Sequence, residues 1–230
     1  MQARRRSIAF AALGIASFAV AMVATLPASL IVRNVAWRSG VGGTIWHGEV
    51  GIAGGSRLEW RFAPLRSLTS LGFAVDWTAT GPDTDLGGQA IAYPGGVRLD
   101  RVAGSADASL LQALQPDLPF TCDAVMQIDV PKLSSVDGGA FAEGRVAIEP
   151  GTCATRPGNV AAATPAMLLT AEHIGQETRI RLVPEAQRRR TLMDATLREN
   201  GTLSFQMTGD GAATLPFTGL PAGAKVEGTF

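Results

Sequence analysis

An apolar run from Ile8 to Val32, with no charged side chain in it, constrains this chain more than any other feature. The hydrocarbon core of a bilayer is about 30 Å thick and needs about 20 apolar residues of helix. Three consecutive arginines stand just before the run, and the positive-inside rule places such a cluster in the cytoplasm. We therefore expect residues 1–7 in the cytoplasm, a transmembrane anchor over residues 8–32, and residues 33–230 outside the cytoplasm.

A cleaved signal peptide is the alternative interpretation of the same run. The apolar core of a secretory signal is about 7–15 residues long and is followed by small residues at the cleavage site. This run is longer, and cleavage after Ala24 or Ala28 would put Met22 or Leu26 where a small residue is preferred. These features favour an uncleaved anchor, and removal of the segment stays open at this point.

The composition is low in charge and rich in turn-forming residues. Charged side chains make up 17% of the 230 residues and the formal net charge is +0, whereas average proteins have about 25% charged residues. Nucleic-acid-binding surfaces are strongly basic, so we expect no nucleic-acid partner. The 27 glycines and 13 prolines favour short strands separated by many turns.

Alternating apolar and polar residues predict β-strands along most of the chain after the apolar run. Leu58, Trp60 and Phe62 alternate with charged residues over 56–63, which predicts a strand with one buried and one solvent-facing side. Pro64 has no N–H to give to a sheet, and therefore ends this strand. Similar segments are 43–50, 72–79, 86–93, 97–102, 120–130, 140–148, 167–173, 178–183, 191–197 and 202–207. They predict a mainly β domain built on an antiparallel sheet.

Several local sequences add specific expectations. Gly48 is typical of a turn or bulge within its strand. Residues 105–114 have the best helical pattern of the β-rich part, and Ser105 is the candidate N-cap. The segments 156–164 and 209–230 are rich in Gly, Ala, Pro and Thr, and are expected to form loops.

Two sequence signals bear on strand pairing. Asn200-Gly201 lies between the last two predicted strands and is a strong signal for a tight hairpin. Gly43–Val50 and Gly139–Val146 share the pattern Gly-x-apolar-x-x-Gly-x-Val. This repeat predicts two copies of one strand–turn–strand unit on a continuous antiparallel sheet, with chance similarity as the alternative.

The two cysteines, Cys122 and Cys153, are candidates for a disulfide. Thiols outside the cytoplasm tend to pair, and closing this loop is worth about 3–4 kcal/mol in the chain-entropy model. The cysteines would meet if the strand 120–130 and the strand 140–148 pair antiparallel. Two unpaired cysteines are the alternative, and a metal site is a weaker one because neither histidine has ligand-like spacing to them.

The sequence contains no recognisable catalytic constellation. His47 and His173 stand alone, and neither a nucleophile elbow, a phosphate-binding loop nor a zinc-protease motif occurs. Asp83 and Asp85 lie in a Gly/Pro-containing loop, where carboxylates usually bond the local backbone. We therefore expect no catalytic, cofactor-binding or metal site, no cofactor, and no enzymatic activity.

Two groups of residues allow more than one interpretation. Trp46, Trp60 and Trp77 are most simply core residues of the sheet, and the alternative is a lipid- or protein-binding surface, because wide apolar sheet faces also serve as interaction sites. Residues 188–190 are three consecutive arginines that we expect in a solvated loop.

The order of several short sequences resembles a known family, protein N of the type II secretion system. The resemblance rests on the arginine-rich start, the span ending in Leu26-Pro27-Ala28, the segment Gly43-Thr44-Ile45-Trp46-His47-Gly48, and Leu58-Glu59-Trp60 followed by Pro64-Leu65. Together they cover about the first third of the chain.

The resemblance implies a non-catalytic accessory subunit in the inner membrane, with a single transmembrane helix and a periplasmic antiparallel β-sheet domain carrying one short helix. Its partners would be other subunits of the type II secretion system, which exports folded proteins across the outer membrane. The family is similar in style to AsmA-like proteins, whose β-sheets are associated with envelope lipids. The competing function is an envelope lipid-handling protein that binds lipid on an apolar groove of the sheet.

Overall fold

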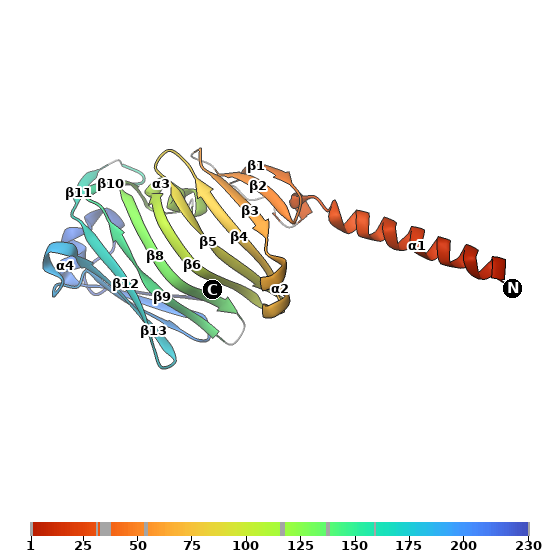
Figure 1. Ribbon diagram of the computed structural model, residues 1–230. Coiled ribbons are helices and arrows are strands. Elements are labelled where there is room, and N and C mark those ends of the chain that lie inside the picture. The colour runs from red at the N-terminus through yellow and green to blue at the C-terminus, as the bar shows by residue number, and fades with distance from the viewer. Residues whose placement is uncertain are drawn as a thin grey trace.

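One large, strongly curved antiparallel sheet dominates the fold (Figure 1). The computed structural model describes residues 2–30, 32, 38–52, 55–115, 118–136, 139–158 and 160–229. Within them, thirteen strands form the large sheet in the order β1-β2-β3-β4-β5-β6-β8-β9-β12-β13-β14-β15-β16. Each strand therefore pairs with its neighbours along the chain, apart from three strands that leave to form a second sheet.

The large sheet begins with β1 (Arg38–Gly43), β2 (His47–Ile52), β3 (Arg57–Phe62), β4 (Phe73–Thr80), β5 (Asp85–Tyr93) and β6 (Gly96–Asp107). It continues with β8 (Val125–Val136), β9 (Gly139–Ile148), β12 (Met167–Ile174), β13 (Glu177–Pro184), β14 (Met193–Arg198), β15 (Thr202–Met207) and β16 (Lys225–Thr229). The second sheet has three strands in the order β11-β10-β7, with β7 (Phe120–Asp123), β10 (Gly151–Thr155) and β11 (Ala161–Thr164).

The register places apolar side chains on one face of the large sheet and charged side chains on the other. Trp60 of β3 lies opposite Trp77 of β4, and Leu182 of β13 lies opposite Leu169 of β12. Because side chains alternate along a strand, the residues between them point to the other face. We call the apolar side the inner face, because the small sheet packs against it, and the charged side the outer face. The antiparallel, mainly β prediction is therefore confirmed.

A helix, α1 (Gln2–Ala24), precedes the sheet and extends away from it (Figure 1). It is followed by the 3-10 turn η1 (Ala28–Leu30). Among the residues that the structure describes, no helix combines the length and the apolar character needed to cross a bilayer. The regular helix ends at Ala24, within the segment 8–32 that was predicted as an anchor.

The junction between α1 and the sheet is fixed by hydrogen bonds. Ile45 N–H donates to the Leu26 carbonyl at 3.0 Å, and the Trp46 indole N–H donates to the Val23 carbonyl at 2.9 Å. Pro27 forms an isolated β-bridge with Thr44. The last turn of α1 is thus held against the β1–β2 turn.

Three short helices interrupt the strands. Helix α2 (Pro64–Ser70) follows β3, and Pro64 stands at its first turn, where the missing N–H costs nothing. Helix α3 (Ala108–Leu114) follows β6, and α4 (Gly209–Thr214) follows β15. The predicted helix over 105–114 therefore starts three residues late, and Ser105 is not its cap. Ser105 instead extends β6, because the strand pairs there with both β5 and β8.

The predicted long strand over 120–130 is broken at Ala124, which is buried. Residues before the break form β7 in the small sheet, and residues after it form β8 in the large sheet. Cys122 of β7 and Cys153 of β10 lie directly opposite each other and form a disulfide, with their Cα atoms 4.0 Å apart. The cysteines do pair, but across the small sheet rather than across the two long strands that the sequence suggested.

Other sequence-based expectations are corrected by long-range pairing. The segment 156–164, predicted to be a loop, contains β11, which pairs with β10. The tail from 209 to 230, also predicted to be a loop, contains α4, the 3-10 turn η3 (Pro216–Thr218) and β16. The hairpin at Asn200-Gly201 is confirmed between β14 and β15.

The two similar segments do not share a structure. Gly43–Val50 covers a turn between β1 and β2, whereas Gly139–Val146 lies within the single strand β9. Gly48 is also not a bulge, since it pairs in regular register with Trp60. Its lack of a side chain leaves room for the Trp60 indole, against which a Cβ atom at this position would collide.

The packing at Gly48 gives a direct test of the fold. Gly48→Ala should lower the free energy of unfolding by about 1–3 kcal/mol, because an added methyl must displace the Trp60 ring and the Thr44 carbonyl. Urea denaturation followed by tryptophan fluorescence measures the change. Gly40→Ala on neighbouring β1 is the matched control, because a Cβ atom added there would meet nothing within 4 Å. Equal unfolding midpoints for the two variants would contradict this packing.

The disulfide gives a second test. Replacing both Cys122 and Cys153 by alanine should lower the free energy of unfolding by about 3–4 kcal/mol, because the reduced chain regains the entropy of an open loop. Reduction with dithiothreitol should lower the free energy of unfolding of the native protein by the same amount and leave that of the double variant unchanged. A native protein whose urea midpoint does not respond to dithiothreitol would refute a stabilising disulfide.

Candidate functional site: the apolar inner face

The two halves of the inner face of the large sheet are covered to different extents. In the C-terminal half, the disulfide-bonded small sheet and η3 pack onto the strands. Cys153 and Phe217 are buried there together with Met167 and Leu182 of the large sheet. Phe120 and Phe217 meet edge to face with ring centroids 5.1 Å apart. An apolar cavity of about 520 Å³ lies between the two sheets in this half and is lined by residues of both sheets, α3 and η3. This half is therefore a covered core that encloses a cavity.

The N-terminal half of the inner face forms an open groove, which we call the apolar groove. It encloses about 460 Å³ and is lined by β2 to β6, with Val32 and Leu110 of α3 at its margins. Its walls include Leu58, Val75 and Ala90, and every lining residue is apolar. Apolar hollows of this size are a common form of ligand-binding site.

The three tryptophans of the segment 43–79 divide between this groove and the junction with α1. Trp60 and Trp77 line the groove, and the Trp60 indole N–H donates to the Ile45 carbonyl at 3.1 Å. The Trp77 indole N–H is buried and has no hydrogen-bond partner among the described residues. Trp46 instead stacks edge to face on Phe62, with ring centroids 4.9 Å apart, and bonds the end of α1. Trp60 and Trp77 thus belong to the candidate interaction surface, and Trp46 joins two elements.

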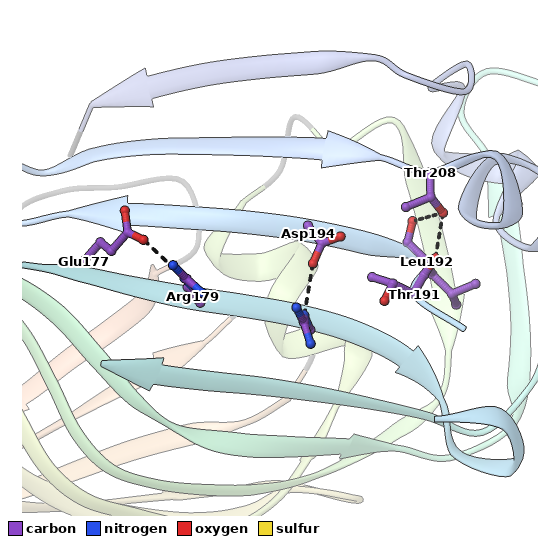
Figure 2. A network of polar contacts seen from close by, with 7 residues as sticks. Glu177, Arg179, Thr191, Leu192, Asp194 and Thr208 are labelled. Atoms are coloured by element: carbon purple, nitrogen blue, oxygen red, sulfur yellow. Dashed lines mark hydrogen bonds and ion pairs between the residues drawn. The ribbon is translucent and has the colours of Figure 1, made fainter. Parts of the chain in front are cut away.

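The outer face carries ion pairs between exposed side chains. Arg181 of β13 contacts Asp194 of β14 at 3.2 Å, and Arg179 contacts Glu177 on its own strand at 3.2 Å (Figure 2). Arg145 and Asp129 form a similar cross-strand pair at 2.9 Å. Exposed pairs contribute only about 0–1 kcal/mol each. Their main effect is to keep this face hydrated, which leaves the inner face as the apolar side of the domain.

The three consecutive arginines lie in an exposed loop between β13 and β14, as predicted. Thr208 fixes the end of this loop, because its hydroxyl lies 2.7 Å from the Thr191 carbonyl and 3.0 Å from the Leu192 carbonyl (Figure 2). Arg190 forms two contacts of 2.8 Å with Asp210. The hydrogen bond from Arg190 lowers the pKa of the Asp210 carboxyl below its ordinary value of 3.8.

The histidines and loop carboxylates do not come together. His47 starts β2, while His173 lies near the end of β12, where its ring contacts the Thr178 hydroxyl at 3.3 Å. Asp83 and Asp85 stand in and beside the turn between β4 and β5. Within the described ranges, no group of three or more His, Cys, Asp or Glu side chains is placed to hold a metal ion.

Comparison with protein-family models gives a match over most of the chain. A protein-family model described as "Type II secretion system (T2SS), protein N" matches residues 34–218. No curated protein and no solved structure matches the chain. The family match covers far more of the chain than the short sequences from which the resemblance was inferred, and it confirms that resemblance. The chain belongs to the protein N family of the type II secretion system.

Proposed function

We propose that this protein is a non-catalytic accessory subunit of the type II secretion system, held at the inner membrane by α1 with its β-domain in the periplasm. The family match over residues 34–218 is the observation that carries the secretion role. The description of that family names a component of a secretion machine and no reaction, which supports a structural rather than a chemical task.

The surface of α1 supports attachment to a membrane. Its large apolar side chains point into solvent, and Phe10, Ile15 and Phe18 are 72%, 71% and 66% exposed. No acidic residue stands in the first turn and no basic residue in the last. A helix that is apolar on all sides needs an apolar environment, and lipid supplies one. The arginines at positions 4–6 then favour a cytoplasmic N-terminus.

The two ends of the large sheet provide sites for other subunits. Within the described ranges, β1 pairs only with β2 and β16 pairs only with β15, so each strand has one unpaired edge. An exposed edge can accept an extended segment of another protein through main-chain hydrogen bonds. All five residues of β16 are exposed. We therefore propose these edges as the contact sites for neighbouring secretion subunits.

The attachment can be tested by placing charge in α1. Leu13→Arg combined with Phe18→Arg should release the protein from carbonate-washed membranes and reduce secretion, because each arginine costs about 2.5–3.5 kcal/mol at the centre of a membrane helix. Immunoblots of membrane and soluble fractions, with assay of exported protein in the medium, give the two readouts. The control is Val160→Arg with Ile174→Arg, which changes two exposed apolar residues of the β-domain. Normal secretion by a fully released α1 variant would refute this role for the helix.

Lipid handling is the second candidate function, and the apolar groove is the observation that favours it. An extended peptide in the groove would bury many backbone N–H and C=O groups against walls whose one unpartnered side-chain donor among the described residues is the Trp77 indole N–H, and unpaired buried amides are costly. A hydrocarbon chain has no such groups. The groove therefore suits an acyl chain better than an extended protein segment.

Filling the groove tests this second function. Ala90→Phe places a ring among the lining residues, whereas Thr78→Phe adds the same ring to the outer face of the neighbouring strand. The purified full-length protein would be irradiated with palmitate that carries a photoreactive diazirine, and labelled peptides identified by mass spectrometry. We expect labelling of β3 to β6 that falls about tenfold in Ala90→Phe, corresponding to about 1.4 kcal/mol of binding free energy, and stays unchanged in Thr78→Phe. Equal labelling of both variants would exclude the groove as the binding site.

A further inference from the structure

Three leucines of α2 and its last turn are exposed to an unusual degree. Leu65, Leu68 and Leu71 are 81%, 75% and 86% exposed, and no residue of α2 is buried. Single exposed leucines are common on protein surfaces. Leu65 and Leu68 lie on the seven-residue helix α2, and Leu71 is the residue that ends it. Together they form a concentrated apolar projection, which we call the leucine patch.

The backbone at Leu71 indicates that its side chain is not required by the fold. Leu71 ends α2 in the left-handed conformation, with φ 52° and ψ 37°. Glycine usually occupies this position, because a Cβ atom is sterically unfavourable there. Leucine therefore carries a conformational cost, while its side chain, being 86% exposed, gains little packing within this chain.

The leucine patch lies at the end of the large sheet from which α1 extends (Figure 1). Helix α2 connects Phe62, the last residue of β3, with Phe73, the first residue of β4, through a short turn. Both rings contact Trp46, at centroid distances of 4.9 and 6.0 Å, and the Trp46 indole bonds the Val23 carbonyl in α1. A continuous chain of contacts therefore joins α2 to the end of α1.

We propose that the leucine patch inserts into the lipid surface beside α1 and so docks the β-domain against the membrane. This inference rests on the attachment of α1 to the membrane proposed above. Interfacial helices bury apolar side chains only about 5–10 Å deep at the boundary between headgroups and acyl chains, a depth that suits a short projecting helix. Arg66, which pairs with Asp76 at 2.9 Å, follows Leu65 at the base of the patch.

A protein partner is less suited to this feature. Stable protein interfaces bury about 800 Å² on each side and need an extended complementary surface. The leucine patch is a narrow projection, and its neighbours on the outer face of β3 and β4 are charged residues such as Arg61 and Asp76. A lipid surface requires no matching shape, since its acyl chains adapt to whatever inserts.

Site-specific labelling tests the inserted leucines directly. The full-length protein with Leu68→Cys would carry an environment-sensitive NBD fluorophore and be reconstituted in phosphatidylethanolamine–phosphatidylglycerol vesicles. We expect a blue-shifted emission, loss of quenching by aqueous iodide, and quenching by lipids with a nitroxide on the acyl chain. Gln187→Cys, an exposed position in the 3-10 turn Glu185–Gln187 that follows β13, is the control and should remain accessible to iodide.

A third labelled position separates this inference from the proposed attachment. With Phe18→Cys the fluorophore reports on α1 itself. A label at Phe18 in lipid together with a label at Leu68 in water would overturn docking by the leucine patch while leaving the attachment intact. A label at Phe18 in water would overturn the attachment. A label at Leu68 that is inaccessible to iodide in cells but accessible in vesicles would show that a protein covers the patch. This result would also overturn the inference.

Discussion

The antiparallel pairing along the large sheet, whose register shifts at three of the strand pairs described, is the constraint on which the other features depend. Because each strand pairs with the strand that precedes it, apart from the β7–β10–β11 excursion, the side-chain alternation of one strand is transferred to the next. Apolar residues as far apart in sequence as Leu58 and Phe205 therefore share one face. A register slip of one residue would turn Trp60 and Trp77 outwards and bring arginines and carboxylates inwards.

The small sheet decides how this shared face is used. It covers only the C-terminal half, and the disulfide between Cys122 and Cys153 holds two of its three strands together. The same apolar pattern therefore lines a covered cavity on one side and an open groove on the other. The groove thus lies in the same half of the sheet as β3 and β4, the two strands that α2 connects.

The sequence predicts the strands well wherever the pattern is local. The alternation around Leu58 and the Asn200-Gly201 turn both specify elements that the structure contains. Prediction from the sequence fails where pairing with residues distant in the chain overrides the local pattern. Ser105 has the features of a helix cap, yet pairing with Gln127 and Asp85 keeps it in a strand. The tryptophans were interpreted most simply as core residues, with an interaction surface as the alternative, and nothing local could reveal which half of the inner face the small sheet covers.

The neighbour-to-neighbour order of the strands also has a consequence for how the protein forms. Most pairings join segments close in sequence, so little loop entropy is lost at each step, and local contacts of this kind allow fast folding. As the chain is synthesised, each hairpin can add to the existing edge before the next strand exists. The small sheet must wait, since Cys122 cannot meet its partner until residue 153 has emerged, and β12 can join β9 only after β10 and β11 have emerged. The open groove would then form first, and the covered half of the inner face last.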